Sequence, residues 1–112
     1  MLPSSVRILV CTEPQDMRRS FDRLAEVVRT AMGEEPQSGA LFVFVGKRAS
    51  RVKVLWWDQN GYCLLYKRLH RALFVVPEAE PGARALRIDA GALRQLLSGV
   101  AHEKKKRERR LH

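Results

Sequence analysis

Apolar and polar positions alternate or cluster along the middle of the chain in a way that predicts three consecutive strands. Leu41–Val45 is a short run that is apolar throughout and contains two β-branched valines, which is typical of a strand covered on both faces. Residues 51–57 alternate, and Asp58-Gln59-Asn60-Gly61 predicts a hairpin that leads into residues 62–69. These three runs hold both tryptophans and both tyrosines, so we expect the rest of the fold to be organised around them.

Helical periodicity follows in two other places. From residue 16 to residue 32 the apolar positions recur every three or four residues and form one stripe: Met17, Phe21, Leu24, Ala25, Val28, Ala31 and Met32. Thr12 and Gln15 can form a capping box before this helix, and Gly33 is predicted to end it in the left-handed conformation. Asp89 is a suitable N-cap for a second helix that would bury Leu93, Leu96 and Leu97, with Gly99 closing it.

Together with a predicted strand at residues 6–11 and a short one at residues 73–76, these elements predict an α+β fold. We expect a small, mostly antiparallel sheet of about four to five strands, with the N-terminal amphipathic helix packed on one face and a C-terminal helix. Residues 1–100 are expected to form a single domain. Residues 101–112 lack apolar periodicity and predict a basic tail, either disordered or a frayed helical extension.

The register of the hairpin can be predicted from its turn. A type I turn over Gln59-Asn60, with Gly61 in the left-handed position, would pair Asp58 with Tyr62. One face, packed on the first helix, would then carry Val52, Val54, Trp56, Leu64 and Tyr66. The other face would carry Arg51, Lys53, Trp57, Cys63 and Lys67. Such an aromatic and cationic face can meet phosphate, but it can equally be a solvated outer face.

Charge is concentrated in two places along a chain whose net charge is +9. Residues 46–71 carry seven basic groups against one acidic group, and residues 101–112 carry six against two. Such a local excess favours a polyanionic partner, most commonly nucleic acid. The predicted DNA contacts are Lys47, Arg48, Arg51, Lys53, Trp57, Lys67, Arg68, Lys104, Lys105, Lys106, Arg107, Arg109 and Arg110.

Catalytic and metal-binding patterns are not found in the sequence. Cys11 and Cys63 lack metal-type spacing, and the three histidines complete no ligand set with them. P-loop, nucleophile-elbow, HExxH and CxxC motifs are absent. We therefore expect no enzyme activity, cofactor or metal. With no apolar run of about 20 residues, no membrane partner is expected either, and the protein is expected to be cytoplasmic.

Three stretches resemble one known family: Asp16-Met17-Arg18 with Phe21-Asp22 and Leu24, then SGALFVF at residues 38–44, and KVLWWDQNGYCLLYKRL at residues 53–69. The chain is similar to the small TnpB-type accessory protein, the second open reading frame, of bacterial insertion sequences of family sixty-six. That family is distinct from the RNA-guided nuclease that shares the name TnpB. The segment from Leu93 to Gly99 resembles the family's Leu-rich ending more loosely. Together these stretches cover about residues 8–100, and the third is the most specific.

The resemblance implies a non-catalytic accessory role in DNA transposition. The strand-transfer chemistry would then belong to a separate transposase, and that transposase and a sibling accessory protein of the same element would be the protein partners. Two interpretations stay open. The chain can bind DNA through the basic hairpin face and tail, and would then be associated with the nucleoid. Alternatively, it can dock on the transposase without touching DNA, using Arg18, Trp57 and Arg68 as anchors. The oligomeric state stays open too.

Overall fold

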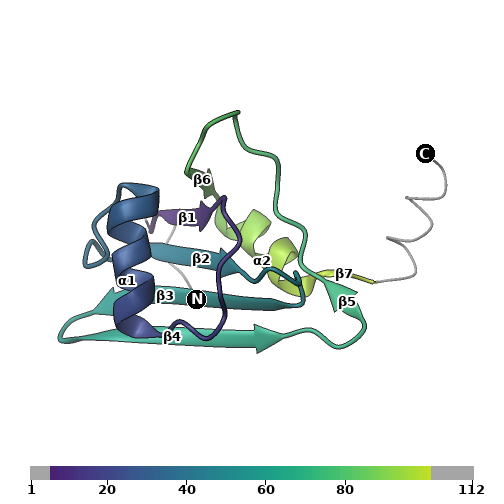
Figure 1. Cartoon of the computed structure of the whole chain (residues 1–112), viewed down its shortest axis with the longest axis horizontal. Coiled ribbons are helices and arrows are strands. Elements are labelled where there is room, and N and C mark those ends of the chain that lie inside the picture. The colour runs from purple at the N-terminus through teal and green to yellow at the C-terminus, as the bar shows by residue number, and fades with distance from the viewer. Residues whose placement is uncertain (1–5, 102–112) are drawn as a thin grey trace.

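A computed structural model of the chain describes residues 6–101 and shows a five-stranded sheet between two helices (Figure 1). The sheet has the strand order β4-β3-β2-β1-β6. Its strands are β1 (Ile8–Cys11), β2 (Leu41–Val45), β3 (Arg51–Asp58), β4 (Gly61–Arg68) and β6 (Ala85–Ile88). β1 and β2 are parallel and the other neighbouring pairs are antiparallel. The predicted α+β class and mostly antiparallel sheet are confirmed.

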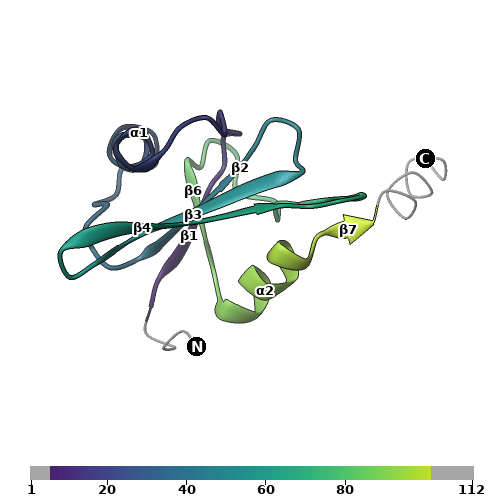
Figure 2. The same ribbon diagram turned by 90° about the horizontal axis from the view of Figure 1, so that it is seen from below.

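The two helices lie on opposite faces of the sheet, as Figure 2 shows. α1 (Phe21–Val27) continues into a π-helical turn, η1 (Val28–Met32), and Gly33 ends it with φ 69° as predicted. α2 (Ala90–Ser98) begins at Asp89, whose Oδ1 accepts a hydrogen bond of 2.7 Å from the backbone N–H of Ala92. The predicted N-cap of α2 is therefore confirmed.

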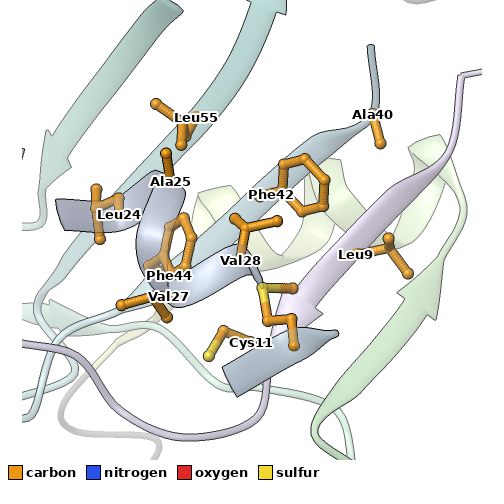
Figure 3. Close-up of a cluster of buried hydrophobic side chains, with 11 residues drawn as sticks. Leu9, Cys11, Leu24, Ala25, Val27, Val28, Ala40, Phe42, Phe44 and Leu55 are labelled. Carbon is orange, nitrogen blue, oxygen red and sulfur yellow. The ribbon is translucent and has the colours of Figure 1, made fainter. Parts of the chain in front are cut away.

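Each face of the sheet has its own apolar core because side chains alternate along the strands. Under α1, the side chains of Phe42, Phe44 and Leu55 pack against Leu24 and Val28 (Figure 3). Under α2, the alternate strand positions Val43, Val52 and Val54 pack against Leu93 and Leu96 of the helix. A separate two-stranded sheet joins β5 (Ala72–Leu73) to β7 (Val100–Ala101) beside the end of α2.

The start of the first helix differs from the prediction. α1 begins after Ser20, and the Thr12 hydroxyl donates a hydrogen bond of 2.7 Å to the carbonyl of Ala83 instead of capping a helix. The capping-box prediction is therefore wrong. The strand predicted at residues 73–76 is also shorter and lies outside the main sheet, whereas β6 was not predicted.

The hairpin register is shifted by one residue from the prediction. Asp58 pairs with Gly61 across a two-residue loop, and Gln59 adopts the left-handed conformation with φ 52°. Because side chains alternate, this one-residue shift changes which β3 side chains share a face with the side chains of β4. Leu64 and Tyr66 therefore share the α1 face with Leu55, whereas Val52, Val54 and Trp56 face α2 rather than the first helix.

None of the helices in residues 6–101 is long and apolar enough to cross a membrane.

Candidate nucleic-acid interface

Cations gather at the end of the sheet where β2 turns into β3. The backbone N–H of Gly46 donates to the carbonyl of Arg51 (2.9 Å), and that of Ala49 donates to the carbonyl of Gly46 (2.9 Å). This tight turn leaves Lys47 and Arg48 exposed at its tip. Both residues were predicted to contact DNA, and the structure places them on an open surface.

The loop before α1 runs along the same end of the sheet. The backbone N–H of Gln15 donates to the carbonyl of Val45 (2.9 Å), and Gln15 forms an isolated parallel bridge with Gly46. The Gln15 side chain is buried; its Nε2 donates to the carbonyl of Glu13, and its Oε1 accepts from Arg19. This loop therefore lies beside the Lys47-Arg48 turn and places Arg18 next to that turn.

Asp16 holds the guanidinium of Arg18 in one orientation. Arg18 Nε donates to both carboxylate oxygens (3.0 and 3.1 Å), Nη2 donates to Oδ2 (2.7 Å), and the Arg18 backbone N–H donates to Oδ1 (2.9 Å). The Arg18 side chain is nevertheless 91% exposed. The hydrogen bonds that Arg18 donates and its charge hold the pKa of Asp16 well below its usual range. The same side-chain hydrogen bonds and the charge of Asp16 raise the pKa of Arg18.

The loop and the turn enclose a hollow of about 360 Å³, here called the basic hollow. Its lining contains four cations and one carboxylate: Arg18, Lys47, Arg48, Arg51 and Asp16, with Gln15, Met17 and Gly46 between them. Met17 lies directly on Gly46, since a Cβ there would stand 2.7 Å from Met17 Cγ. Glycine at position 46 is thus what allows the loop to approach the turn.

Arg68 adds a further cation beside the hollow, because it lies directly opposite Arg51 at the last pair of β3 and β4. The backbone N–H of Leu69 donates to the carbonyl of Ser50 (2.8 Å), so the chain after β4 stays next to the turn. We call these five side chains the basic end of the sheet: Arg18, Lys47, Arg48, Arg51 and Arg68.

Two other predicted phosphate contacts lie elsewhere. Lys53 is buried on the α1 face, where its Nζ donates to the carbonyl of Arg19 (2.6 Å) and lies over the Tyr66 ring. Burial lowers the pKa of the Lys53 amino group, although the charge of Asp16 opposes this. Lys67 projects from the α2 face, where its Nζ donates to the carbonyl of Leu97 (2.8 Å). The prediction that Lys53 and Lys67 lie on one cationic face is therefore wrong.

Trp57 lies near the opposite end of β3. It is six residues from Arg51, which corresponds to roughly 20 Å along a strand. Its ring packs edge-to-face on Tyr62, with centroids 5.0 Å apart. A stacking tryptophan and the cation cluster therefore do not share one small surface. The proposed partner anchors are divided in the same way, with Arg18 and Arg68 at the basic end and Trp57 at the other.

The last of the predicted DNA contacts belong to the tail. The tail cations from Lys104 to Arg110 lie outside the described residues. Within residues 6–101, no three His, Cys, Asp or Glu side chains come close enough to hold a metal ion. Cys11 and Cys63 are free thiols, and burial raises the pKa of Cys11.

Sequence reasoning missed Asp16, Gln15 and Met17 as members of the site. The signal available was the Asp16-Met17-Arg18 motif, which had been assigned to the helix instead of to a loop. Only the contact of the loop with Gly46 shows why these three residues and the turn belong together.

Comparison with known proteins gives one family match and two similar proteins. The family model described as IS66 Orf2 like protein matches residues 6–107. "Uncharacterized protein y4hO" of Sinorhizobium fredii (strain NBRC 101917 / NGR234) is 46% identical over 102 residues, 89% of this chain and 87% of that protein. "Uncharacterized protein y4jC" of the same strain is 37% identical over 78 residues, 70% of this chain and 67% of that protein. No solved structure matches the chain significantly.

Proposed function

Since the chain belongs to the IS66 Orf2-like family of insertion-sequence proteins, we propose that it is a non-catalytic accessory protein of transposition that binds DNA through its basic end. The family supplies the link to transposition. The DNA contact is our inference from the charge and geometry of the described residues, and the basic hollow is the observation that carries it.

The composition of the basic hollow suits a phosphate group. Its one carboxylate, Asp16, is already bonded to Arg18, so an entering anion meets an excess of positive charge. Arg18 uses Nε and Nη2 for Asp16, which leaves Nη1 for a phosphate oxygen. Because Asp16 already orients the guanidinium, little side-chain entropy is lost when Arg18 binds.

The same geometry favours contact with the DNA backbone over reading of bases. The cations of the basic end come from a turn, a loop and two strand ends, and within residues 6–101 no helix projects among them. Contacts of this kind fix position and supply affinity without carrying sequence information. We propose that the tail cations, Lys104, Lys105, Lys106, Arg107, Arg109 and Arg110, add sequence-independent affinity.

Fluorescence anisotropy with a labelled DNA duplex tests this function. In the variant Lys47→Gln/Arg48→Gln, two cations at the hollow are neutralised on exposed positions. The matched control is Arg87→Gln/Arg94→Gln, which removes the same charge from exposed positions on β6 and α2. We expect the first variant to bind at least about tenfold more weakly than the control at moderate salt. Equal affinity of the two variants would show that the basic end is not the binding surface.

A second candidate function is docking on the transposase. An apolar groove of about 410 Å³ supports it, because Trp56, Leu65 and Leu97 line this groove at the end of the hairpin remote from the basic end. Of the proposed anchors, Trp57 borders the groove. A pull-down with the transposase in nuclease-treated extract tests this candidate. Retention that Leu65→Asp abolishes and Lys47→Gln/Arg48→Gln leaves unchanged would support docking at the groove.

A further inference from the structure

β4 forms one edge of the main sheet and is open to solvent among the described residues. It is last in the strand order, it is eight residues long, and its exposed side chains include Leu65 (41%) and Tyr66 (50%). The opposite edge, β6, is only four residues long. Sheet edges are usually protected from pairing by charges or prolines. In β4 the charges stand only at one end, at Lys67 and Arg68, and residues 62–66 are uncharged.

The backbone groups that β4 presents to solvent can be assigned. In an antiparallel pair, alternate residues exchange both backbone hydrogen bonds with the neighbouring strand. The N–H of Leu69 donates to Ser50, so odd-numbered β4 residues bond to β3. The even-numbered residues Tyr62, Leu64, Tyr66 and Arg68 therefore direct their N–H and C=O groups outward. The backbone groups of these four residues are therefore regularly spaced along the edge and free to pair with another strand.

We infer that two copies of this chain pair through β4, antiparallel about a two-fold axis at Leu65, and so join their two sheets into one continuous sheet. In this register Tyr62 lies opposite Arg68 of the second copy, and Leu64 lies opposite Tyr66 of the second copy. The two Leu65 side chains meet on the α2 side. All four outward-facing residues then find backbone partners.

Self-pairing suits this edge because of where its charges lie. Lys67 would lie opposite Cys63 of the second copy and Arg68 opposite Tyr62, so no two cations oppose each other across the interface. An arginine over a tyrosine ring is a favourable neighbour. If the axis lay at Leu64, Arg68 would lie opposite Asn60, which is outside the strand. If it lay at Tyr66, fewer residues of the two β4 strands would lie opposite each other. The register centred on Leu65 is therefore the best match.

Pairing of this kind also places the two basic ends on the same side of the joined sheet. A two-fold axis perpendicular to the sheet keeps each face continuous, and Arg51 and Arg68 share the α1 face. Arg68 stands three residues from the axis in each copy, so the two basic ends lie roughly 20 Å apart along the strands. The dimer itself is inferred from the edge alone, and it can be tested in the absence of DNA.

Sedimentation equilibrium of the full, nuclease-treated chain gives the first test. We expect twice the chain mass of 12.8 kDa. Tyr66→Pro removes an outward N–H and no bond to β3, so it should give a folded monomer. Tyr66→Ala removes the same side chain but keeps the N–H, so it should remain a dimer. A monomeric wild-type chain at about 100 μM, well above a micromolar dissociation constant, would overturn the inference. So would a Tyr66→Pro variant that is folded by circular dichroism and still dimeric.

Cysteine cross-linking gives a second test that does not depend on the proline variant. With Cys63→Ser as background, Leu65→Cys places two thiols across a non-hydrogen-bonded pair whose Cα atoms are about 4.5 Å apart, within disulfide range. Mild oxidation should yield a covalent dimer. Arg68→Cys in the same background is the control, since its two copies would lie roughly 20 Å apart. Cross-linking of Arg68→Cys as efficient as that of Leu65→Cys, or no cross-linking of Leu65→Cys, would contradict the register.

Discussion

Lys53 and Tyr66 lie directly opposite each other on β3 and β4, and the Lys53 ammonium stands 4.9 Å from the centroid of the Tyr66 ring. The same ammonium donates a hydrogen bond to the carbonyl of Arg19, just before α1. Lys53 therefore ties the loop that precedes the helix to the sheet. A residue that the hairpin sequence places on a phosphate-binding face is instead a structural cation.

Lys53→Ala should destabilise the fold without weakening DNA binding. The substitution removes the packing of the lysine stem and leaves the Arg19 carbonyl without its partner, which we expect to lower the free energy of unfolding by about 1–3 kcal/mol. Urea denaturation measures this change. Lys47→Ala, at an exposed turn position, is the control and should change stability by less than about 0.5 kcal/mol. If the Lys53→Ala variant is as stable as the wild-type chain but binds DNA more weakly, Lys53 is a DNA contact and not a structural residue.

Asp16 should remain ionised at a pH where an ordinary aspartate is half protonated, about 3.9. The hydrogen bonds from Arg18 lower its pKa in the folded chain, so its contribution to stability is complete above the unfolded-chain pKa. That contribution is lost as the pH falls through the folded-state pKa. NMR titration of the carboxyl carbon measures the shift. Arg18→Gln should raise the Asp16 pKa toward its ordinary value, whereas Arg23→Gln, on the exposed side of α1, should not.

Gly46→Ala should disturb the loop of the basic hollow. The new methyl group would stand 2.7 Å from Met17 Cγ and 3.4 Å from the carbonyl oxygen of Arg51, so Met17 must move. We expect a loss of about 1–3 kcal/mol in stability and weaker DNA binding. Met17→Ala makes room, so Gly46→Ala should cost less in that background. Equal costs of Gly46→Ala in the two backgrounds would show that Met17 is not what excludes a side chain at position 46.

The sequence was sufficient for the elements whose signals are local. The apolar run of β2, the helical stripe of α1, the left-handed Gly33 and the Asp89 cap are each specified by residues within a few positions of one another. The hairpin register was not, because Asp58-Gln59-Asn60-Gly61 is compatible with a two-residue and a three-residue loop. Gln59 has a positive φ, which non-glycine residues adopt infrequently, so the sequence favoured Gly61 for that role.

That single shift also explains why the candidate site changed. With the observed register, Lys53 turns toward α1 and Lys67 toward α2, which leaves Arg51 opposite Arg68 as the cationic pair of the hairpin. The periodicity that assigned Met17 to the helical stripe was misleading, because Met17 packs on Gly46 from a loop. Met17 and Gly46 are 29 residues apart, so their contact cannot be recognised from the spacing of apolar residues within either segment.

The central claim is that the basic end of the sheet binds the DNA backbone, and a salt titration of DNA binding tests it most directly. The full chain would be compared with a variant in which all six tail cations are replaced by glutamine: Lys104, Lys105, Lys106, Arg107, Arg109 and Arg110. If the basic end makes about five phosphate contacts, the tail-neutral variant should still bind, with a log–log salt slope of about −4 to −5. Binding that vanishes when the tail is neutralised, or a salt slope near zero, would contradict the claim.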